Sequence, residues 1–574
     1  MSGIKHLAGQ GRLGVILVVA VLVVCFVSAT GSLHDAYSDV SPRTIYVNAG
    51  NVNDPGEDGS QAHPFDRIQE GLNVSGSGDV VDVAGGVYYE EVTISKGRSG
   101  VSLVGEQGAI VDGEGKRNGI RIGVYMVPDY LYNVTVMGLT VRNCVKGIDL
   151  VRCRGIRLRN NTLVGNEYNF ADYSLGLDHD VDTSNTVDGK PIYYWVNEHD
   201  RQIPPDAGFV ALINSRDIVV RDLNLTRNGQ GMLLKNTTLS TIENVSISDN
   251  QDGIYLEAGN TNNTITDNSI LNNTYTGIYM SASNQNTISD NVIIGNYYGV
   301  YLTTASGACT GNLVINNTIK NHWQGIALQG YPNLPVLRNI FKNNELSNNS
   351  IAISTYLSAL NQIYHNNFVN NEEQAETQDS QNTFDYLGEG NYWSDYNGTD
   401  ANNNGIGDTP YVVGEQNVDN FPLMGLFDSF NVLWQGTTFV LETISSSAAS
   451  NVHFNQSEES ISFDLAAYVN ETGFCSARIP EELLGGPYEV LVGGNEVPVL
   501  NQESNGTYSF VYFKYLGEGG RVEILGSTVP EFLPIPLISF FVAVTVLIVF
   551  LTRTSASAAE HRRDKARTLD ASAA

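Results

Sequence analysis

Two acidic segments contain the residues whose types and spacing are best suited to chemistry. The first is LDHDVD, with Asp178, His179, Asp180 and Asp182. A histidine beside carboxylates can serve as a general acid or base on an acidic sugar. Three arginines of the following repeat are Arg216, Arg221 and Arg227. A solvated loop whose aspartates cap its own turns gives the same pattern and is the favoured interpretation, so no residue is assigned as catalytic.

The second segment, DANNNGIGD, has the spacing of an EF-hand-like calcium loop. Such a loop needs oxygen ligands at alternate positions and a glycine for the tight turn. The predicted ligands are Asp400, Asn402, Asn404, the Ile406 carbonyl and Asp408, with Gly405 at the turn. Tyr411 replaces the usual glutamate, so the predicted Ca²⁺ affinity is modest, about 10⁻⁴ to 10⁻³ M, unless Asp395 or Asp419 folds in. A turn held by its own side-chain hydrogen bonds is the alternative.

Aromatic residues near predicted turns offer a third kind of chemistry, the stacking of rings on sugars. They are Tyr193, Tyr194, Trp195, Tyr297, Tyr298 and Trp323. In a solenoid, any one such ring is more often packed between coils. The long face of a solenoid is nonetheless a suitable groove for a linear polymer. The aromatic residues therefore support a binding interpretation without fixing a site.

The element that must position these residues is a repeat between about residues 132 and 370. Its unit of roughly 22 to 26 residues indicates a solenoid. Apolar and polar residues alternate over short stretches, which is typical of strands with one buried face. Ile254 and Ile278 should occupy equivalent buried positions in adjacent coils. The pattern predicts an all-β fold, a right-handed parallel β-helix.

Other recurrent residues predict how the coils are built and capped. Asparagines predicted to form ladders between coils are Asn250, Asn273, Asn296 and Asn321, and Asn268, Asn291 and Asn316. Glycines predicted to mark a turn before the last strand are Gly231, Gly253, Gly277, Gly299 and Gly325. A short amphipathic helix from Phe65 to Val74, begun by Asp66, is predicted to cap the N-terminal end.

The remaining segments predict a protein of the cell surface. Residues 1–29 are typical of a secretory signal peptide, with an uncleaved anchor as the alternative. Residues 533–552 predict a transmembrane helix, and the basic residues of 553–574 predict a cytoplasmic tail. Residues 430–526 predict a small β-sandwich between the β-helix and the membrane. Several N-x-S/T sequons, such as those at Asn244 and Asn505, predict glycosylation.

Charge and cysteine content argue against two further classes. The net charge of −30 makes nucleic acid an improbable partner. The four cysteines outside the signal segment are Cys144, Cys153, Cys309 and Cys475, and none lies in a CxxC motif. A metal–thiolate site is therefore not indicated, while a disulfide between Cys144 and Cys153 stays open.

Several motifs resemble known families. TIYVNAG, from Thr44, and GDVVDVAGGVYYEEVTI, from Gly78, resemble the opening of pectate-lyase-like β-helix proteins. DTSNTVDGKPIYYW, from Asp182, and GNYWSDYNGTDANNNGIGDTPY, from Gly390, resemble the NosD family, and the latter closes the helix in many archaeal surface proteins. The likeness covers about residues 44–425, the predicted β-helix domain. VPEF, from Val529, resembles the PEF-CTERM sorting signals of archaea, which implies a tail that is exchanged for a lipid link.

The resemblance implies three functions. The leading one is a non-enzymatic surface protein that binds a polysaccharide or a cell-envelope glycan, or that contributes to the envelope structure. The second is a polysaccharide lyase, epimerase or hydrolase, since β-helix proteins of both kinds exist. The third is a role in copper-enzyme maturation, from which the NosD family takes its name. Copper sites need clustered His, Met or Cys, and the nine His and six Met form no such run.

Overall fold

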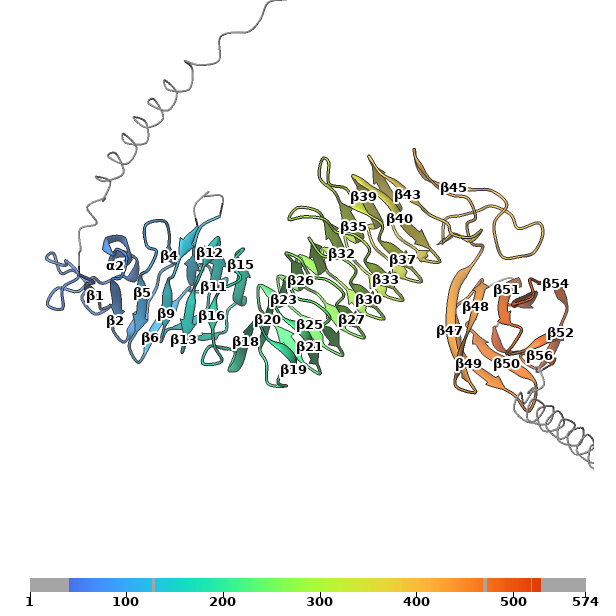
Figure 1. Cartoon of the computed structure of the whole chain (residues 1–574), viewed down its shortest axis with the longest axis horizontal. Helices are drawn as coiled ribbons and strands as arrows, with labels where there is room; N and C mark the ends of the chain where they lie inside the picture. The colour runs from blue at the N-terminus through green and yellow to red at the C-terminus, as the bar shows by residue number, and fades with distance from the viewer. Residues whose placement is uncertain (1–40, 126–129, 468–471, 518, 528–574) are drawn as a thin grey trace, which may run out of the picture. The chain divides into compact units, whose positions relative to one another are not determined.

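The computed structural model describes residues 41–125, 130–467, 472–517 and 519–527 (Figure 1). Contacts divide the chain into two units. The first unit runs to Phe384 and includes Val412–Val418, and the second contains Asp385–Tyr411 and the residues from Asp419 onward.

The first unit is a parallel β-solenoid of the right-handed type with about 13 turns. In its N-terminal half each coil contributes strands to three sheets. The first sheet has the order β1 (Thr44–Val47), β2 (Val80–Val83), β5 (Ser102–Gly105), β9 (Thr135–Met137), β13 (Arg157–Arg159) and β16 (Asp180–Val181). The second sheet begins with β3 (Gly86–Tyr88), β6 (Ala109–Asp112), β10 (Thr140–Arg142) and β14 (Thr162–Val164). The third sheet holds β4 (Val92–Ile94), β7 (Ile120–Ile122), β11 (Lys146–Val151) and β15 (Tyr168–Tyr173), while β8 (Leu131–Tyr132) pairs with β12 (Cys153–Arg154).

In the C-terminal half the second sheet continues and supplies the last strand of each coil. It runs through β17 (Thr186–Val187), β18 (Lys190–Val196), β20 (Phe209–Ile213), β23 (Gln230–Lys235), β26 (Asp252–Glu257), β29 (Thr276–Ser281), β32 (Tyr298–Thr303), β35 (Gln324–Gln329), β39 (Ile351–Tyr356) and β42 (Glu373–Gln378). The fourth sheet contains β19 (His199–Gln202), β21 (Arg216–Arg221), β24 (Thr241–Glu243), β27 (Thr264–Thr266), β30 (Thr287–Ser289), β33 (Leu313–Ile315), β37 (Ile340–Lys342) and β40 (Ser358–Tyr364), with β36 (Val336–Leu337) and β43 (Gln381–Thr383) also paired to β40. The fifth sheet contains β22 (Asn224–Thr226), β25 (Ser246–Ser248), β28 (Ser269–Leu271), β31 (Val292–Ile294), β34 (Thr318–Lys320), β38 (Glu345–Ser347) and β41 (Asn367–Val369).

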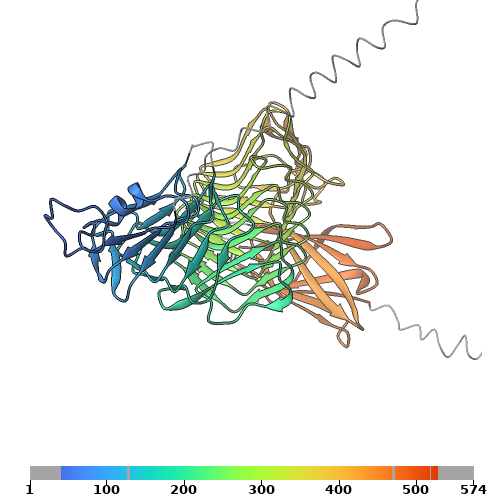
Figure 2. The same ribbon diagram turned by 60° about the vertical axis from the view of Figure 1, so that its left-hand side comes forward.

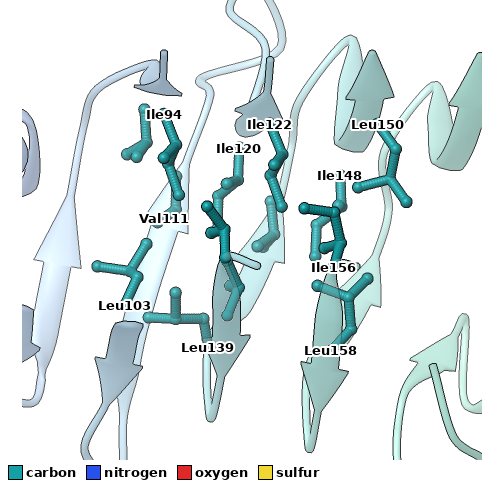
Figure 3. Close-up of a cluster of buried hydrophobic side chains, with 14 of the residues drawn as sticks. Ile94, Leu103, Val111, Ile120, Ile122, Leu139, Ile148, Leu150, Ile156 and Leu158 are labelled. Carbon is teal, nitrogen blue, oxygen red and sulfur yellow. The ribbon is translucent and has the colours of Figure 1, made fainter. Parts of the chain in front are cut away.

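The coils stack because alternate side chains of each strand enter a continuous apolar core (Figure 3). One column of this core joins Ile94, Ile122 and Leu150, which are register partners in successive strands of the third sheet. In the C-terminal half, Ile254 pairs with Ile278, and both side chains are fully buried. The predicted parallel β-helix and the predicted register of Ile254 and Ile278 are therefore confirmed.

Buried asparagines form ladders between coils, as predicted, through bonds to the backbone and to one another. Asn291 Oδ1 accepts bonds from the backbone N–H of Asn268 at 3.0 Å and from Asn268 Nδ2 at 2.9 Å. Asn291 Nδ2 in turn donates to the carbonyl of Ile265 at 2.9 Å. Each rung therefore satisfies polar groups of the turn that water cannot reach.

Two predicted rungs are wrong by one residue. Asn317, and not Asn316, follows Asn291 in its ladder, and His322, and not Asn321, follows Asn296. Asn316 and Asn321 have φ values of 57° and 60°, and this left-handed conformation turns the chain so that the next side chain points inward.

The recurrent glycines lie inside strands of the second sheet, and not in turns as predicted. A Cβ atom on Gly277 would lie 2.6 Å from the carbonyl oxygen of Gly299 and 2.7 Å from Cγ2 of Ile293. Gly253 faces the carbonyl of Gly277 in the same way, at 2.3 Å. Close approach of neighbouring coils is therefore the reason for glycine at this position.

The N-terminal cap is a helix, α2 (Ile68–Val74), that begins later than predicted. Its N-cap residue is Arg67, whose side chain makes no capping bond. The buried Glu90 carboxylate instead accepts the backbone N–H groups of Ile68 and Gln69 at 2.8 and 3.1 Å. A residue distant in sequence therefore caps this helix, and Asp66 does not begin it.

The two halves of the solenoid meet at a step around the antiparallel pair β17–β18, in the teal to green region of Figures 1 and 2. Here the first and third sheets end at β16 and β15, the fourth and fifth sheets begin at β19 and β22, and the second sheet continues across the step. Ala211 and Leu233, in β20 and β23, join the core of the N-terminal half. The ring of Phe209 meets that of Phe170 edge to face at 4.9 Å. The step therefore brings β15 beside strands from much later in the sequence.

The second unit contains two antiparallel five-stranded sheets. One has the order β47 (Leu426–Trp434), β48 (Thr437–Ser445), β51 (Thr472–Pro480), β55 (Tyr508–Leu516), β54 (Val499–Ser504). The other has the order β49 (Ala449–Asn455), β50 (Ser460–Leu465), β56 (Gly520–Ser527), β52 (Gly485–Val492), β53 (Asn495–Val497). Buried residues of both sheets, such as Phe463 and Phe513, belong to one core cluster. The described strands therefore extend from Leu426 to Ser527, slightly beyond the predicted 430–526. The segment before them carries β44 (Tyr392–Trp393), while β45 (Tyr411–Gly414) pairs with β46 (Asn417–Asp419).

Three predicted segments, 1–29, 533–552 and 553–574, lie outside the described residues. Among the helices that are described, none combines the length and apolar character needed to cross a membrane. The four cysteines of the described chain, Cys144, Cys153, Cys309 and Cys475, are buried free thiols, so Cys144 and Cys153 are not joined.

Candidate functional site

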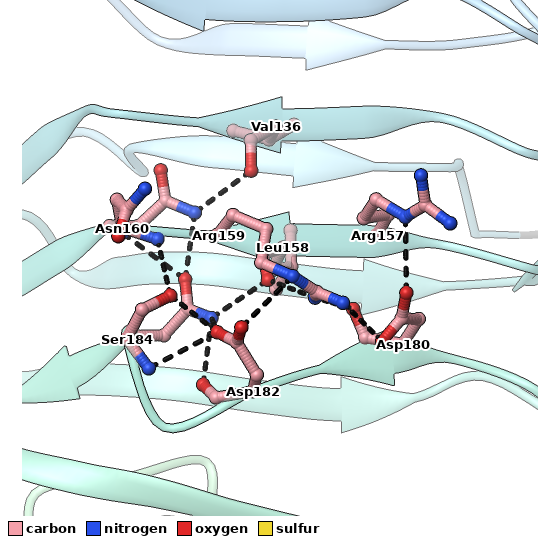
Figure 4. Close-up of polar contacts among 10 residues, drawn as sticks. Val136, Arg157, Leu158, Arg159, Asn160, Asp180, Asp182 and Ser184 are labelled. Atoms are coloured by element: carbon pink, nitrogen blue, oxygen red, sulfur yellow. Dashed lines mark hydrogen bonds and ion pairs between the residues drawn. The ribbon is translucent and has the colours of Figure 1, made fainter.

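The predicted LDHDVD segment does not form one cluster. Asp180 and Asp182 lie beside Arg157 and Arg159 of the adjacent strand (Figure 4), whereas His179 is buried. Asp180 is exposed and accepts a bond from Arg157 Nε at 3.0 Å, and Arg159 Nε lies 3.0 Å from Asp182. The bonds from Arg159 and Arg157 hold the pKa of Asp180 below its usual value. Asp178 accepts the backbone N–H of Gly155 at 3.1 Å. These aspartates thus fix the surface of two adjacent coils.

His179 points the other way, into a buried polar network. Its Nδ1 accepts the backbone N–H of Ile156 at 3.1 Å, so its Nε2 carries the proton and donates to Ser174 Oγ at 2.7 Å. Ser174 Oγ in turn donates to Asp172 Oδ1 at 2.6 Å. Burial lowers the pKa of His179 and therefore keeps the ring neutral. A neutral ring with both nitrogens engaged has a structural role.

The same network contains a buried ion pair. Lys235 Nζ lies 3.0 Å from Asp172 Oδ2, and both side chains are almost completely buried. Tyr194 OH donates to the same Oδ2 at 2.8 Å. Burial raises the pKa of Asp172, but the charge of Lys235 and the hydrogen bonds from Ser174 and Lys235 act together to hold this pKa below its usual value. Asp172 lies in β15 and Lys235 lies in β23, so this ion pair joins the two halves of the solenoid at the step.

The arginines that follow in sequence do not converge on these residues. Arg216 pairs with Asp217 at 2.8 Å, and Arg227 pairs with Asp188 at 2.9 Å. Arg221 lies 3.7 Å from Glu243. Arg216 therefore pairs with its neighbour in sequence, and Arg221 and Arg227 pair with residues of adjacent coils.

The predicted calcium loop is a tight turn closed by its acidic side chains. Asp400 Oδ1 and Oδ2 accept the backbone N–H groups of Asn404 and Gly405 at 3.1 and 2.9 Å, and Asn404 Oδ1 accepts that of Ile406 at 2.8 Å. Asp408 Oδ2 accepts the N–H of Ala401 at 2.9 Å. Gly405 has a φ of 88°, as a turn glycine requires.

Neither of the extra carboxylates considered for this loop joins it. Asp419 is fully buried, and its Oδ2 accepts the indole N–H of Trp393 at 2.9 Å and the backbone N–H of Asn391 at 2.8 Å. Asp395 accepts the hydroxyl of Tyr411 at 3.1 Å. Neither Asp395 nor Asp419 therefore adds a ligand oxygen to the predicted calcium loop.

Aromatic rings cover the outer face of the second sheet just beyond the step. Tyr255, Tyr279 and Tyr301 are register partners in β26, β29 and β32. The rings of Tyr255 and Tyr279 stack with centroids 4.2 Å apart, and Tyr301 meets Tyr279 at 5.6 Å. Tyr173, from β15, meets Tyr255 edge to face at 6.0 Å. The step thus adds a ring from the N-terminal half to a row built by the repeat.

A second, more exposed row runs beside the first. Tyr275, Tyr297 and Trp323 each precede a strand of the second sheet and are 44%, 41% and 42% exposed. Tyr297 stacks on Tyr275 at 5.9 Å and on Trp323 at 4.7 Å. Tyr298 fills the space between the rows, 4.8 Å from both Tyr297 and Tyr301. We call the two rows together, with Tyr173 and Tyr298, the aromatic face.

A buried carboxylate lies at one end of the aromatic face. Asp252 accepts bonds from Tyr173 OH at 2.9 Å and from Thr276 Oγ1 at 2.6 Å. Burial raises the pKa of Asp252 to about 6, although the bonds from Thr276 and Tyr173 oppose this shift. Lys146 Nζ lies 4.8 Å from the centre of the Tyr173 ring. A carboxyl group that titrates near neutral pH is suited to proton transfer as well as to packing.

The structure separates the aromatic residues predicted from sequence into two groups. Tyr297, Tyr298 and Trp323 belong to the aromatic face, whereas Tyr193 and Trp195 pair on β18, 6.2 Å apart. Tyr194 is buried in the ion-pair network. The members that sequence reasoning missed are Tyr173, Tyr255, Tyr275, Tyr279 and Tyr301. The recurring segments GIYL, GIYM and GVYL place a tyrosine at the same position of successive repeats, and this period could have indicated Tyr255, Tyr279 and Tyr301.

The described residues do not offer a donor set that fits copper. In these parts of the chain, one group of three acidic, His or Cys side chains brings its ligand atoms within 4.8 Å, and it consists of Glu57, Asp66 and Glu70. Its oxygen atoms suit hard cations, whereas copper prefers nitrogen and sulfur. His179 and His322 engage both ring nitrogens within the solenoid.

Comparison with known proteins agrees with the solenoid and its repeats. The family model described as periplasmic copper-binding protein (NosD) matches residues 180–345 and 307–398. The probable ABC transporter binding protein NosD of Stutzerimonas stutzeri is 38% identical over 99 residues, which is 17% of this chain and 22% of the relative. The chain thus spans about a fifth of the length of this curated relative.

The solved structures that match this chain do so with low TM-scores. The mannuronan C-5 epimerase AlgE6 A-module of Azotobacter vinelandii has a TM-score of 0.25 at 13% identity, with 58% of this chain and 99% of that one covered. The polygalacturonase of Erwinia carotovora has 0.25 at 14% identity, covering 59% and 95%. A complex of XylC with xylose has 0.26 at 11% identity, covering 71% and 91%.

The fold defines the class of this protein as a parallel β-solenoid repeat protein. Residues 180–345 and 307–398 of this solenoid protein are similar to the NosD family model.

Proposed function

We propose that this protein is a non-enzymatic cell-surface protein whose aromatic face binds a polysaccharide or a glycan of the cell envelope. The exposed stack of Tyr275, Tyr297 and Trp323 is the observation that carries the proposal. Exposed aromatic rings leave apolar surface in contact with water. The apolar C–H faces of a sugar ring can pack on these rings and cover that surface. The row follows the stacking direction of the coils, as a linear polymer requires.

The location belongs to the same proposal. The matched family is described as periplasmic, and the N-terminal and C-terminal segments predict secretion and a membrane anchor. We place the solenoid on the outer side of the plasma membrane, where envelope glycans are present. The archaeal origin and the exchange of the tail for a lipid remain predictions of the motif at Val529.

The test is retention of polysaccharides by the detergent-solubilised full chain. Affinity electrophoresis in gels that contain polygalacturonate, alginate, xylan or β-glucan measures binding, and analysis of reducing ends measures product release. Tyr297→Ala with Trp323→Ala should weaken retention about tenfold or more, since each stacked ring contributes about 0.5–1.5 kcal/mol beyond its buried area. Val292→Ala, on an exposed side chain of the same coil, is the matched control.

The second candidate function is a polysaccharide lyase, epimerase or hydrolase. Asp252 favours it, because a carboxyl group with a pKa of about 6 beside a tyrosine hydroxyl can take part in proton transfer. Burial to 2% exposure argues against direct contact with a substrate, and this is why binding without reaction leads. Products that appear with the parent and vanish with Asp252→Asn would replace the leading proposal with this one.

Calcium is a further part of the proposal. We assign a Ca²⁺ site of modest affinity to the turn that contains Asp400, Asn402, Asn404, Ile406 and Asp408. The support is the spacing of its oxygen-bearing residues and the turn at Gly405. Copper does not enter the proposal, because the donor atoms of the described residues do not fit it.

A further inference from the structure

A cavity of about 450 Å³ lies within the second unit, away from the solenoid and its aromatic face. One wall is the sheet that contains β48, β51, β55 and β54, and the other is the segment that contains Glu389 and Asn404. The sheet turns its outer face to the cavity, because Arg478 lines the cavity while its neighbour Ala477 belongs to the core. The volume falls in the range of roughly 300–1,000 Å³ that is typical of small-molecule sites.

Four residues of the cavity form one row across this sheet. Glu442 in β48 is the register partner of Arg478 in β51. Arg478 is in turn opposite Phe510 in β55, and Phe510 is opposite Glu503 in β54. Neighbouring strands are about 4.8 Å apart, so the backbone of Glu503 lies roughly 10 Å from that of Arg478. Phe510 therefore separates the carboxylate at one end of the row from the cation.

The charges of the cavity are not balanced. Arg478 Nη1 lies 2.6 Å from Glu442 Oε2, and Arg478 Nη2 contacts the carboxylate of Glu389. Among the residues that line the cavity, all of them described, Arg478 is the one cation, whereas Glu389, Glu442 and Glu503 are acidic. Three formal negative charges against one positive charge leave an excess of two. This excess attracts a cationic ligand and repels an anionic one.

The aromatic lining suits an organic cation. The Arg478 guanidinium lies 5.1 Å from the centre of the Phe510 ring and 5.9 Å from that of Tyr508. These distances are within the range at which the faces of aromatic rings attract cations. Ile406 and Phe427 add apolar surface to the same cavity. A ligand that carries both a positive charge and a carbon body therefore matches the lining better than an inorganic ion does.

The arrangement of the carboxylates also argues against a metal ion. A calcium or magnesium ion needs several oxygen ligands that converge on one point. Within the described ranges, the acidic group whose ligand atoms converge within 4.8 Å consists of Glu57, Asp66 and Glu70, and none of these lines the cavity. The carboxylates of the cavity are thus placed to surround a larger ligand.

We propose that this cavity binds a small organic cation whose charged group is an ammonium. The ammonium would pair with Glu503 and lie against the ring of Phe510, and the carbon body would cover the apolar surface of Ile406 and Phe427. The inference stands without the proposed polysaccharide binding, since the cavity shares no residue with the aromatic face.

The experiment compares three five-carbon probes that differ in charge, on the detergent-solubilised full chain with a calcium chelator present. Saturation-transfer NMR measures binding of 1,5-diaminopentane, its neutral counterpart pentane-1,5-diol and its anionic counterpart glutarate. The diamine should bind, more weakly at high salt, and the other two should bind more weakly than the diamine or not at all. Equal binding of the three probes, or no binding of the diamine, would overturn the proposal.

Three variants assign the binding to this cavity. Glu503→Gln should weaken binding of the diamine about twofold to fivefold, whereas Glu496→Gln, an exposed change in β53 of the other sheet, should not. Phe510→Leu keeps an apolar side chain but removes the ring, and should also weaken binding about twofold to fivefold.

Arg478→Gln separates ligand binding from a structural role, because it removes the cation that the cavity already contains. Binding of the diamine should become several-fold tighter, as the excess negative charge rises by one. Weaker binding in an Arg478→Gln variant that keeps the parent's melting temperature would overturn the proposal. Unchanged binding in both Glu503→Gln and Phe510→Leu would overturn it as well.

Discussion

The asparagine ladders predict a large effect from a single change, Asn291→Ala. This substitution removes the Oδ1 atom that accepts both the backbone N–H and the Nδ2 of Asn268. Both of these donors belong to a residue that is 2% exposed, so no bulk water replaces the lost acceptor. Each buried group left without its partner costs about 1–3 kcal/mol, and two such groups give an expected loss of about 2–6 kcal/mol.

The loss should be local, because each coil of a solenoid contacts only its neighbours. Hydrogen–deuterium exchange with mass spectrometry on the full chain should show faster exchange for peptides that cover β27, β28, β30 and β31, with little change near β5 or β9. Asn224→Ala removes an exposed asparagine in β22 and serves as the control. Equal exchange in the two variants would refute the role assigned to the ladder.

Three other outcomes follow from the structure. Ile278→Asp places an unpaired charge at a fully buried position and should cost several kcal/mol in urea unfolding, and a variant as stable as the parent would contradict the register. The pKa of Asp252 is about 6 in the folded chain and about 3.9 when unfolded, so the folded state binds the extra proton in this window and stability falls as the pH rises through it. Asp252→Asn cannot titrate, and from pH 4.5 to pH 7.5 its stability should therefore rise relative to the parent by roughly 2 kcal/mol; a pH-independent difference would show that Asp252 has an ordinary pKa. Calorimetric titration with millimolar Ca²⁺ should give heat with the parent and with the exposed control Glu489→Ala, but not with Asp400→Ala combined with Asp408→Ala, and equal heats in all three would leave only a turn.

The fold was predictable because its determinants are local and repeated. Alternation around Ile254 and Ile278 specifies which side chains enter the core, and one register follows from the next. The ladders were predictable in kind but not in register. In the pair Asn316–Asn317 either residue could point inward, and the left-handed φ of the first decides the matter. Sequence pattern does not encode that choice.

The candidate site was predictable only where the repeat carries it. Tyr297 and Trp323 follow the period of the coils and were found. Tyr173 and Asp252 meet because the solenoid changes its arrangement at the step, which joins β15 to strands about 80 residues later. His179 was a weaker candidate from sequence, and the structure buries its side chain away from the exposed Asp180.

The most direct test of the carbohydrate-binding proposal is an experimental structure of the full chain with an oligosaccharide of the polymer that it retains. The account predicts sugar rings stacked on Tyr275, Tyr297 and Trp323 and aligned with the stacking direction of the coils. An oligosaccharide bound elsewhere on the solenoid, with these three rings left uncovered, would contradict it.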